Sequence, residues 1–97
     1  MIEIARYQFD GPYYEVLTNF NEVAAVYVIL DANNKVIDVG ETEALKTRLV
    51  SHERRNCWER NCGRGIYVAV FREDRKERRL EIEKQIRAGY NFPCGEN

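Results

Sequence analysis

The chain has 97 residues, of which 44% are apolar and 32% charged. This fits a single domain over residues 1–97 with a packed core, and it excludes general disorder. No apolar run approaches the roughly 18 residues of a membrane-spanning helix, so we expect no membrane partner. Residues 1–4 lack the basic and apolar character of a secretory signal, and the expected location is therefore cytoplasmic.

The net charge of −1 conceals two halves of opposite sign. Residues 1–45 hold two bases and eight acids, whereas residues 46–87 hold thirteen bases and seven acids. Most of these bases are arginines, whose planar guanidinium groups suit bidentate contacts to phosphate. The alternative is a solvated helix face on which Arg and Glu pair at a spacing of four. The charge therefore permits a nucleic-acid partner without requiring one.

The N-terminal half is predicted to contain an extension and a β-hairpin. Residues 1–23 are loosely patterned around a turn signal at 10–12, and they are predicted to form an N-terminal extension. Residues 24–30 are an apolar, β-branched run of strand length. After a turn at 32–35, residues 36–39 provide the second strand of the hairpin.

The C-terminal half is predicted to contribute two helices and a third strand. A helix is expected over residues 44–53, a loop over 56–65 and a strand over 66–71. A second helix is expected over 74–88, where Gly89 ends it, and the remaining tail is expected to lie back on the domain. The resulting fold class is α+β, with a small three-stranded antiparallel sheet and flanking helices in β-β-α-β-α order.

The three cysteines are expected to be free thiols. Cys57, Cys62 and Cys94 are an odd number in a chain without an export signal, which favours the reduced form. The spacing of five between His52, Cys57 and Cys62 does not match the close cysteine pairs of structural zinc sites. Zinc is therefore not predicted.

Two short strand motifs in residues 24–97 carry a family resemblance. Ala25-Val26-Tyr27 lies in the first strand of the predicted hairpin, and Asp38-Val39-Gly40 ends the second. In position they resemble the Gly-Ile-Tyr and Tyr-Ile-Gly signatures of the GIY-YIG nuclease family. Four later residues resemble, in order, the family's helix arginine, a histidine of some members, the metal-binding glutamate and a C-terminal asparagine: Arg48, His52, Glu83 and Asn97.

This resemblance implies hydrolysis of DNA phosphodiester bonds at one divalent cation, Mg2+ or Mn2+. Glu83 would bind the cation, whose other positions are filled by water and phosphate oxygens. Arg48 would stabilise the charge that develops on the scissile phosphate. Tyr27 would align or deprotonate the attacking water, and His52 would assist proton transfer.

Each of these residues also has an ordinary structural explanation. Glu83 can pair with Arg79 or Arg87 one helical turn away. Tyr27 can pack its ring in the core, as strand tyrosines often do. His52 can interact with the dipole at the C-terminal end of its helix.

Two acids depart from the family pattern near the expected phosphate site. Asp38 stands in place of the second signature tyrosine, and Glu41 follows the signature glycine, where the family often has a base. One hypothesis is that Asp38 is a second metal ligand across from Glu83. The other is that the negative charge opposes DNA binding, so that the scaffold is a catalytically weakened or inactive module that binds nucleic acid or protein.

The arginine-rich loop after the first helix is a second candidate surface for nucleic acid. Its arginines can hold phosphates while its lone tryptophan stacks on a base. Alternatively, the tryptophan anchors the loop on the domain. A further class of function, a structural or regulatory partner, would use the aromatic N-terminal segment to contact a protein. The candidate nucleic-acid contacts are Arg54, Arg55, Trp58 and Arg60.

Overall fold

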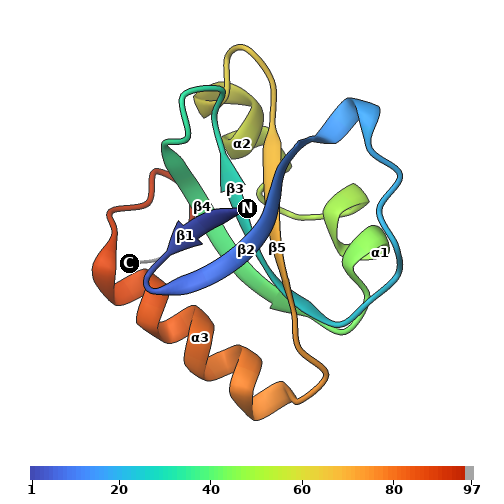
Figure 1. The fold of residues 1–97 in the computed structure, drawn as a ribbon. Helices are drawn as coiled ribbons and strands as arrows, with labels where there is room; N and C mark the ends of the chain where they lie inside the picture. The colour runs from blue at the N-terminus through green and yellow to red at the C-terminus, as the bar shows by residue number, and fades with distance from the viewer. Residues whose placement is uncertain (96–97) are drawn as a thin grey trace.

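The computed structural model describes residues 1–95, which form an α+β fold around one curved antiparallel sheet (Figure 1). The strands lie in the order β1-β2-β5-β3-β4. Their bounds are β1 (Ile2–Ile4), β2 (Tyr7–Tyr14), β3 (Ala25–Leu30), β4 (Val36–Thr42) and β5 (Tyr67–Arg72). The helices are the 3-10 turn η1 (Glu15–Leu17), α1 (Leu45–Val50), α2 (Arg55–Asn61) and α3 (Lys76–Gly89). None of the helices in the described part of the chain is long and apolar enough to cross a membrane.

The sheet is larger than the sequence predicts. A three-stranded sheet in β-β-α-β-α order is wrong, because residues 2–14 add β1 and β2, and β2 pairs with β5. The turn signal at 10–12 lies inside β2, where the register shifts between Asp10 and Tyr13. Such an irregularity lets a strand accommodate Gly and Pro, which otherwise suggest a turn. Phe9 in β2 is fully buried, which explains why this segment joins the sheet.

The prediction of a loop over residues 56–65 is also wrong for the first half of that segment. Arg55–Asn61 form helix α2, with Trp58 fully buried and Cys62 nearly so just after the helix. These two apolar residues are four apart and so lie on one helical face, a signal too short to stand out in the sequence. The expected hairpin, third strand and last helix are confirmed with small changes of boundary.

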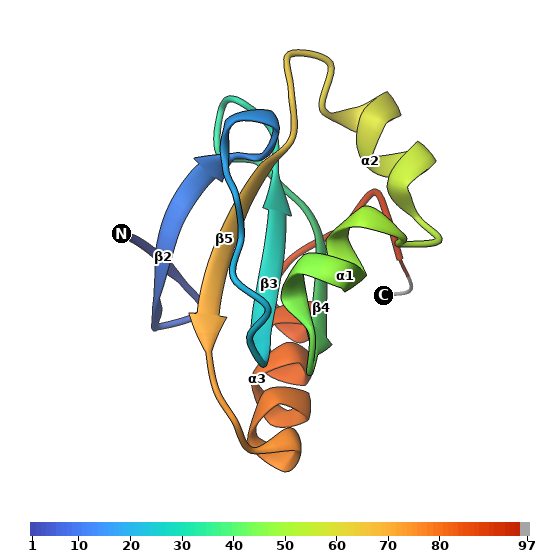
Figure 2. The same ribbon diagram turned by 90° about the vertical axis from the view of Figure 1, so that its right-hand side faces the viewer.

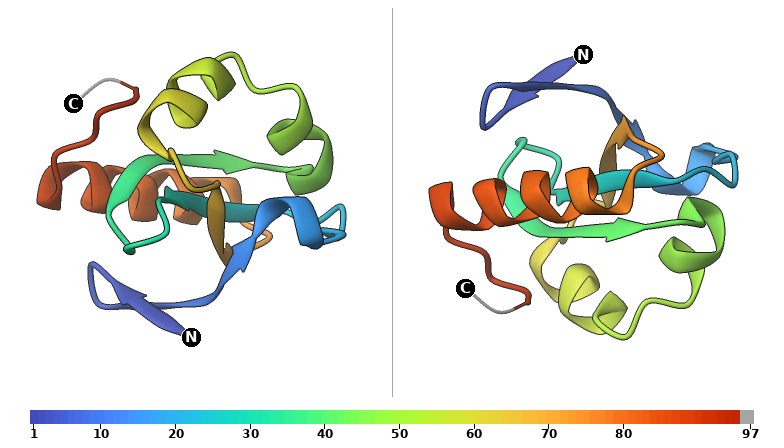
Figure 3. Two further views of the ribbon diagram at one scale, coloured as in Figure 1. Left: turned by 90° about the horizontal axis from the view of Figure 1, so that it is seen from above. Right: turned by 90° about the horizontal axis from the view of Figure 1, so that it is seen from below.

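The sheet is covered on both faces near β3 and β4. Helix α3 lies on one side of these strands, and α1 and α2 lie on the other (Figure 3). Along β3, Tyr27 and Ile29 belong to the apolar cluster that includes residues of α1 and α2. Val26 and Val28 belong to the cluster that includes residues of α3. Strand β3 is therefore buried along its whole length, as its continuous apolar sequence requires.

The C-terminal tail returns to the edge strand β4 and is covalently tied to α2. The Cys94 N–H donates to the carbonyl of Ile37 at 3.1 Å. A disulfide joins Cys94 to Cys57, 37 residues earlier, while Cys62 is free and buried. The expectation of free thiols is therefore wrong for two of the three cysteines, because tertiary packing brings together residues that lie far apart in the sequence. Asn97, the expected C-terminal asparagine, lies outside the described residues.

Candidate functional site

Tyr27 is at the centre of the site that the resemblance implies. It lies opposite Gly40 in the β3–β4 ladder, and its ring covers that glycine so closely that an added Cβ would collide with the hydroxyl group. The tyrosine of the first motif thus packs on the glycine of the second, and a residue with a Cβ atom would not fit at position 40. Burial raises the pKa of Tyr27 to about 12, although the charge of Arg48 and a hydrogen bond with it act in the opposite direction. At neutral pH Tyr27 is therefore a neutral phenol.

Arg48 reaches this site from α1 and is held by an acid. Its Nη1 and Nη2 donate to the carboxylate of Glu53 at 2.7 and 3.0 Å. The Arg48 side chain is still about one-third exposed, whereas Tyr27 is buried. Arg48 therefore places a permanent, partly exposed cation beside the phenol, where an anionic ligand can reach it.

His52 follows the end of α1 and lies in the same aromatic cluster. Its ring is 6.0 Å from that of Tyr27 and 4.5 Å from that of Trp58, centroid to centroid. Nδ1 accepts a hydrogen bond from the Arg54 N–H at 3.0 Å, which assigns the proton of the neutral imidazole to Nε2. Within residues 1–95, Nε2 is buried and has no hydrogen-bond partner. An unsatisfied buried donor of this kind has the chemistry to bind an oxygen atom of a ligand.

Lowering the pH is expected to destabilise the fold through His52. Burial first, and then the charges of Arg48 and Arg54, lower the pKa of His52 from 6.5 to about 4. The unfolded chain therefore binds a proton near pH 6.5 that the folded protein does not bind, so stability falls as the pH drops through this window. We expect a loss of about 2 kcal/mol between pH 7 and 5, measured by urea denaturation. His52→Gln should show little of this slope, and an equal slope in both proteins would contradict the assignment.

Asp38 is a fully buried carboxylate that accepts five hydrogen bonds. Oδ2 accepts from Arg54 Nε at 2.7 Å and from Trp58 Nε1 at 2.8 Å. Oδ1 accepts from the Val39 N–H at 2.8 Å, from Arg87 Nη2 at 3.3 Å and from Arg54 Nη2 at 3.4 Å. A carboxylate offers about four lone-pair directions, so these donors occupy both oxygens. Two permanent cations also balance its charge, and this leaves no oxygen of Asp38 directed to a metal ion.

The second unexpected acid, Glu41, is neutralised in a similar way. Its Oε1 accepts from Arg79 Nε at 2.9 Å. Arg79 is almost completely buried, and its Nη1 also donates to the carbonyls of Glu73 and Asp74. The negative charges that distinguish this chain from the family pattern are therefore both paired with buried or half-buried arginines.

Glu83 is an acid with a single, long ion pair among residues 1–95. It lies on α3, and its side chain is about one-quarter exposed. Its partner is Arg87 at 3.7 Å, a longer separation than in a hydrogen-bonded ion pair. Burial raises the pKa of Glu83 against the opposing effect of Arg87. Of the two pairings expected from the sequence, the one with Arg87 is present, whereas Arg79 pairs with Glu41.

The donor set fits one divalent cation held by a single carboxylate. Residues 1–95 contain no group of three or more His, Cys, Asp or Glu side chains that could enclose a metal ion. Mg2+ often binds to one or two carboxylates and keeps several waters, which suits Glu83. Asp38 does not fit as a second ligand, since its oxygens already accept five hydrogen bonds.

The candidate nucleic-acid residues of the predicted loop lie on and beside α2. Trp58 is fully buried, which agrees with the anchor alternative and leaves no exposed ring face for a base. Arg54 is bound to Asp38, and Arg55 forms two hydrogen bonds with the carboxylate of Glu15 at 2.8 and 2.9 Å. Arg60 is exposed. The arginines, and not the tryptophan, are therefore the groups of this segment that solvent reaches.

Tertiary packing also brings two arginines to the site that the sequence does not place beside Asp38. The sequence predicts Arg54 as a contact to nucleic acid, and Arg87 only as a partner of Glu83. Both hold Asp38, and Arg87 Nη2 also donates to the Val39 carbonyl at 2.7 Å. No local pattern identifies these contacts, which join residues up to 49 positions apart.

Comparisons with protein-family models, with curated proteins and with solved structures find no match. A function for this chain is therefore a proposal that depends on the motifs resembling the GIY-YIG signatures and on the local geometry around Tyr27.

Proposed function

We propose that this protein is a divalent-metal-dependent DNA endonuclease that hydrolyses phosphodiester bonds. The observation that carries the proposal is that Asp38, on the edge strand β4, accepts hydrogen bonds from both Arg54 and Arg87. Arg54 follows the helix that carries Arg48, and Arg87 pairs with Glu83 on α3. The helix of Arg48 and the helix of Glu83, which cover opposite faces of the sheet, are therefore joined through Asp38 at its β4 edge. Arg48 adds a partly exposed cation beside the phenol, as phosphate chemistry requires.

Each residue of the site is assigned a role that its environment supports. Glu83 would hold Mg2+ or Mn2+, and a cation bound there supplies charge that stabilises a phosphoryl oxygen. Arg48 would bind the phosphate as a permanent cation. Tyr27, neutral at physiological pH, would orient the attacking water. His52 would donate a hydrogen bond from Nε2 to a bound oxygen.

Asp38 and Glu41 are each paired with an arginine, and this pairing favours the binding of a polyanion. Two unpaired carboxylates at this position would repel phosphate. Each is instead hydrogen-bonded to arginine, at 2.7 Å for Asp38 and 2.9 Å for Glu41. The acids act as supports that fix the arginines, and their charge is largely cancelled. A cytoplasmic location stays part of this proposal and rests on the sequence.

A second candidate is a non-catalytic module that binds nucleic acid or protein on the same scaffold. The bidentate contact between Arg48 and Glu53 favours it, because this contact must open before Arg48 can bind a phosphate with both nitrogens. In this case the exposed arginines would provide weak, salt-sensitive affinity without cleavage.

A nicking assay on supercoiled DNA with Mg2+ or Mn2+ tests the proposal. Arg48→Ala and Glu83→Gln are expected to lower the rate by about 100- to 1,000-fold, because each removes stabilisation of charge in the transition state. Lys46→Ala and Glu81→Gln are matched controls, since both residues are exposed on the same two helices, and they should retain full activity.

Two outcomes would contradict the endonuclease proposal. Cleavage that survives both Arg48→Ala and Glu83→Gln would place the activity elsewhere or in a contaminant. Absence of cleavage by the wild-type protein on duplex, single-stranded and branched DNA would favour the binding module.

A further inference from the structure

A cavity of about 270 Å³ lies beside the proposed site, on the same face of the sheet as Tyr27. The segment that joins η1 to β3 descends across this face and forms one wall of the cavity (Figure 2). Val70 and Leu45, both buried, form its apolar floor. Val70 is the cross-strand partner of Tyr27, and Leu45 begins the helix that carries Arg48. The cavity therefore adjoins the residues that would act on a phosphate.

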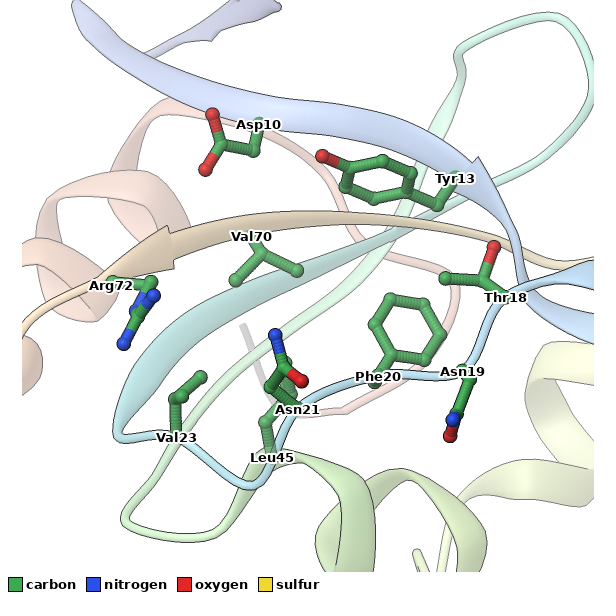
Figure 4. Close-up of a pocket in the computed structure, with 10 residues that line it drawn as sticks. All are labelled: Asp10, Tyr13, Thr18, Asn19, Phe20, Asn21, Val23, Leu45, Val70 and Arg72. Atoms are coloured by element: carbon green, nitrogen blue, oxygen red, sulfur yellow. The ribbon is translucent and has the colours of Figure 1, made fainter.

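The lining of the cavity suits a flat ring with a polar edge. Phe20 forms one wall and meets Tyr13 edge to face, with ring centroids 6.2 Å apart. Asn21 directs its amide toward the space between Phe20 and Val70, whereas Asn19 points away from it (Figure 4). An amide supplies both a donor and an acceptor. Apolar surfaces with one such group are complementary to a heteroaromatic base, which carries donors and acceptors on its edge.

An uncommitted arginine marks one end of the cavity. Arg72 lies at the end of β5, where its backbone pairs with Ala25. The residue is exposed, and its guanidinium has no hydrogen bond or ion pair with another residue of the described chain. Arg48, Arg54 and Arg79, in contrast, are all paired with acids. Asp10 borders the same end, and its carboxylate can accept a hydrogen bond from an exocyclic amino group. The free guanidinium is suited to a phosphate attached to the bound ring.

We propose that this cavity binds one unstacked nucleobase, with the adjoining phosphate on Arg72. The volume suits a single base, because it falls just below the roughly 300 Å³ at which pockets for drug-sized ligands begin. The inference deepens the proposed endonuclease function and rests on it for the link to cleavage: a base held here would place the next phosphate near Arg48 and Tyr27. A substrate with an unpaired base would then be preferred to a perfect duplex, since its base need not be unstacked first.

Binding measured without metal separates this inference from catalysis. The probes are a short labelled single-stranded DNA of mixed sequence, the same sequence as a duplex, and a deoxynucleoside monophosphate. Fluorescence anisotropy reports affinity, and NMR shifts of the Leu45 and Val70 methyl groups report occupancy of the cavity. Phe20→Leu should weaken binding of the single strand by about 5-fold or more while it preserves apolar packing. Arg72→Gln should also weaken it and reduce the salt slope by about one.

Control variants distinguish a failure of the base-binding inference from a failure of the endonuclease proposal. Arg64→Gln, an exposed arginine outside the cavity, should leave both affinity and methyl shifts unchanged, and Glu83→Gln should retain binding. Wild-type affinity in both Phe20→Leu and Arg72→Gln, or methyl groups that do not shift with any probe, would overturn the inference even if the protein nicks DNA. Binding that depends on Phe20 and Arg72 in a protein that cleaves nothing would support the inference and contradict the endonuclease. Tighter binding of the monophosphate than of the strand would identify a free nucleotide as the source of the base.

Discussion

Replacing Asp38 with asparagine is expected to lower the free energy of unfolding by about 3 to 5 kcal/mol. The carboxylate is fully buried and accepts from Arg54, Arg87 and Trp58. An amide of the same shape would turn a donor toward these donors and leave two cations without their buried counter-charge. Breaking a buried pair by removing one partner costs far more than losing a surface pair. Chemical denaturation monitored by the fluorescence of Trp58 measures the change directly.

An exposed aspartate provides the matched control for this substitution. Asp74 is exposed and lies just before α3, so Asp74→Asn should change stability by less than about 0.5 kcal/mol. Stability of Asp38→Asn equal to that of Asp74→Asn would contradict the structural role of Asp38. A titration with Mg2+ or Mn2+ addresses the other hypothesis for this residue. Unchanged metal affinity in Asp38→Asn, with affinity lost in Glu83→Gln, would exclude Asp38 as a metal ligand.

Reduction of the disulfide between Cys57 and Cys94 is expected to lower the free energy of unfolding by about 4 kcal/mol in chain-entropy terms. The bond closes a loop over a separation of 37 residues, which removes much of the freedom of the unfolded chain. It also holds the tail against β4, where the Cys94 N–H donates to Ile37. The measurement is denaturation of the wild-type protein with and without reductant. Cys57→Ser should have the stability of the reduced wild type and should not respond to reductant. If reductant destabilises Cys57→Ser as much as it destabilises the wild type, the pairing is contradicted.

Thiol labelling followed by intact mass measurement checks the same pairing independently. Burial raises the pKa of the Cys62 thiol to about 11, so the native oxidised protein should take up no label. Unfolding without reductant should expose Cys62 alone, and unfolding with reductant should expose all three cysteines. In a reducing compartment the two paired thiols would stay separate, and the fold would lose the stabilisation that the bond provides.

The hairpin and its central contact follow from local signals. A continuous apolar run, a turn and a second strand fix β3 beside β4, and the register of a hairpin then places Tyr27 opposite Gly40. The last helix is likewise predictable from its length and boundary residues. The N-terminal strands are not predicted, because Gly11 and Pro12 in the middle of β2 indicate a turn when read locally. Only pairing with β5 makes an extended conformation favourable there.

For the site residues too, positions can be predicted from the sequence but contacts cannot. The spacing of Arg48 and His52 after Gly40 can be read from the sequence, but their environments cannot. Asp38 reads as an acid beside a phosphate, whereas the fold surrounds it with donors that lie 16, 20 and 49 residues later. Its charge is therefore compensated by residues that no local pattern connects to it.

Local signals in the sequence predict the apolar strands β3 and β5, the hairpin partner β4 and the helix α3. Which charges are paired, which two cysteines form a disulfide and how β1 and β2 extend the sheet follow only from the packing of distant segments. The physical reason is that secondary structure depends on side-chain periodicity over a few residues, whereas ion pairs, disulfides and sheet order depend on which distant segments bury the same surface. The net charge of −1 shows this most directly. It is the sum of many charges, and only the fold shows that Asp38 and Glu41 are neutralised while Arg72 is left exposed.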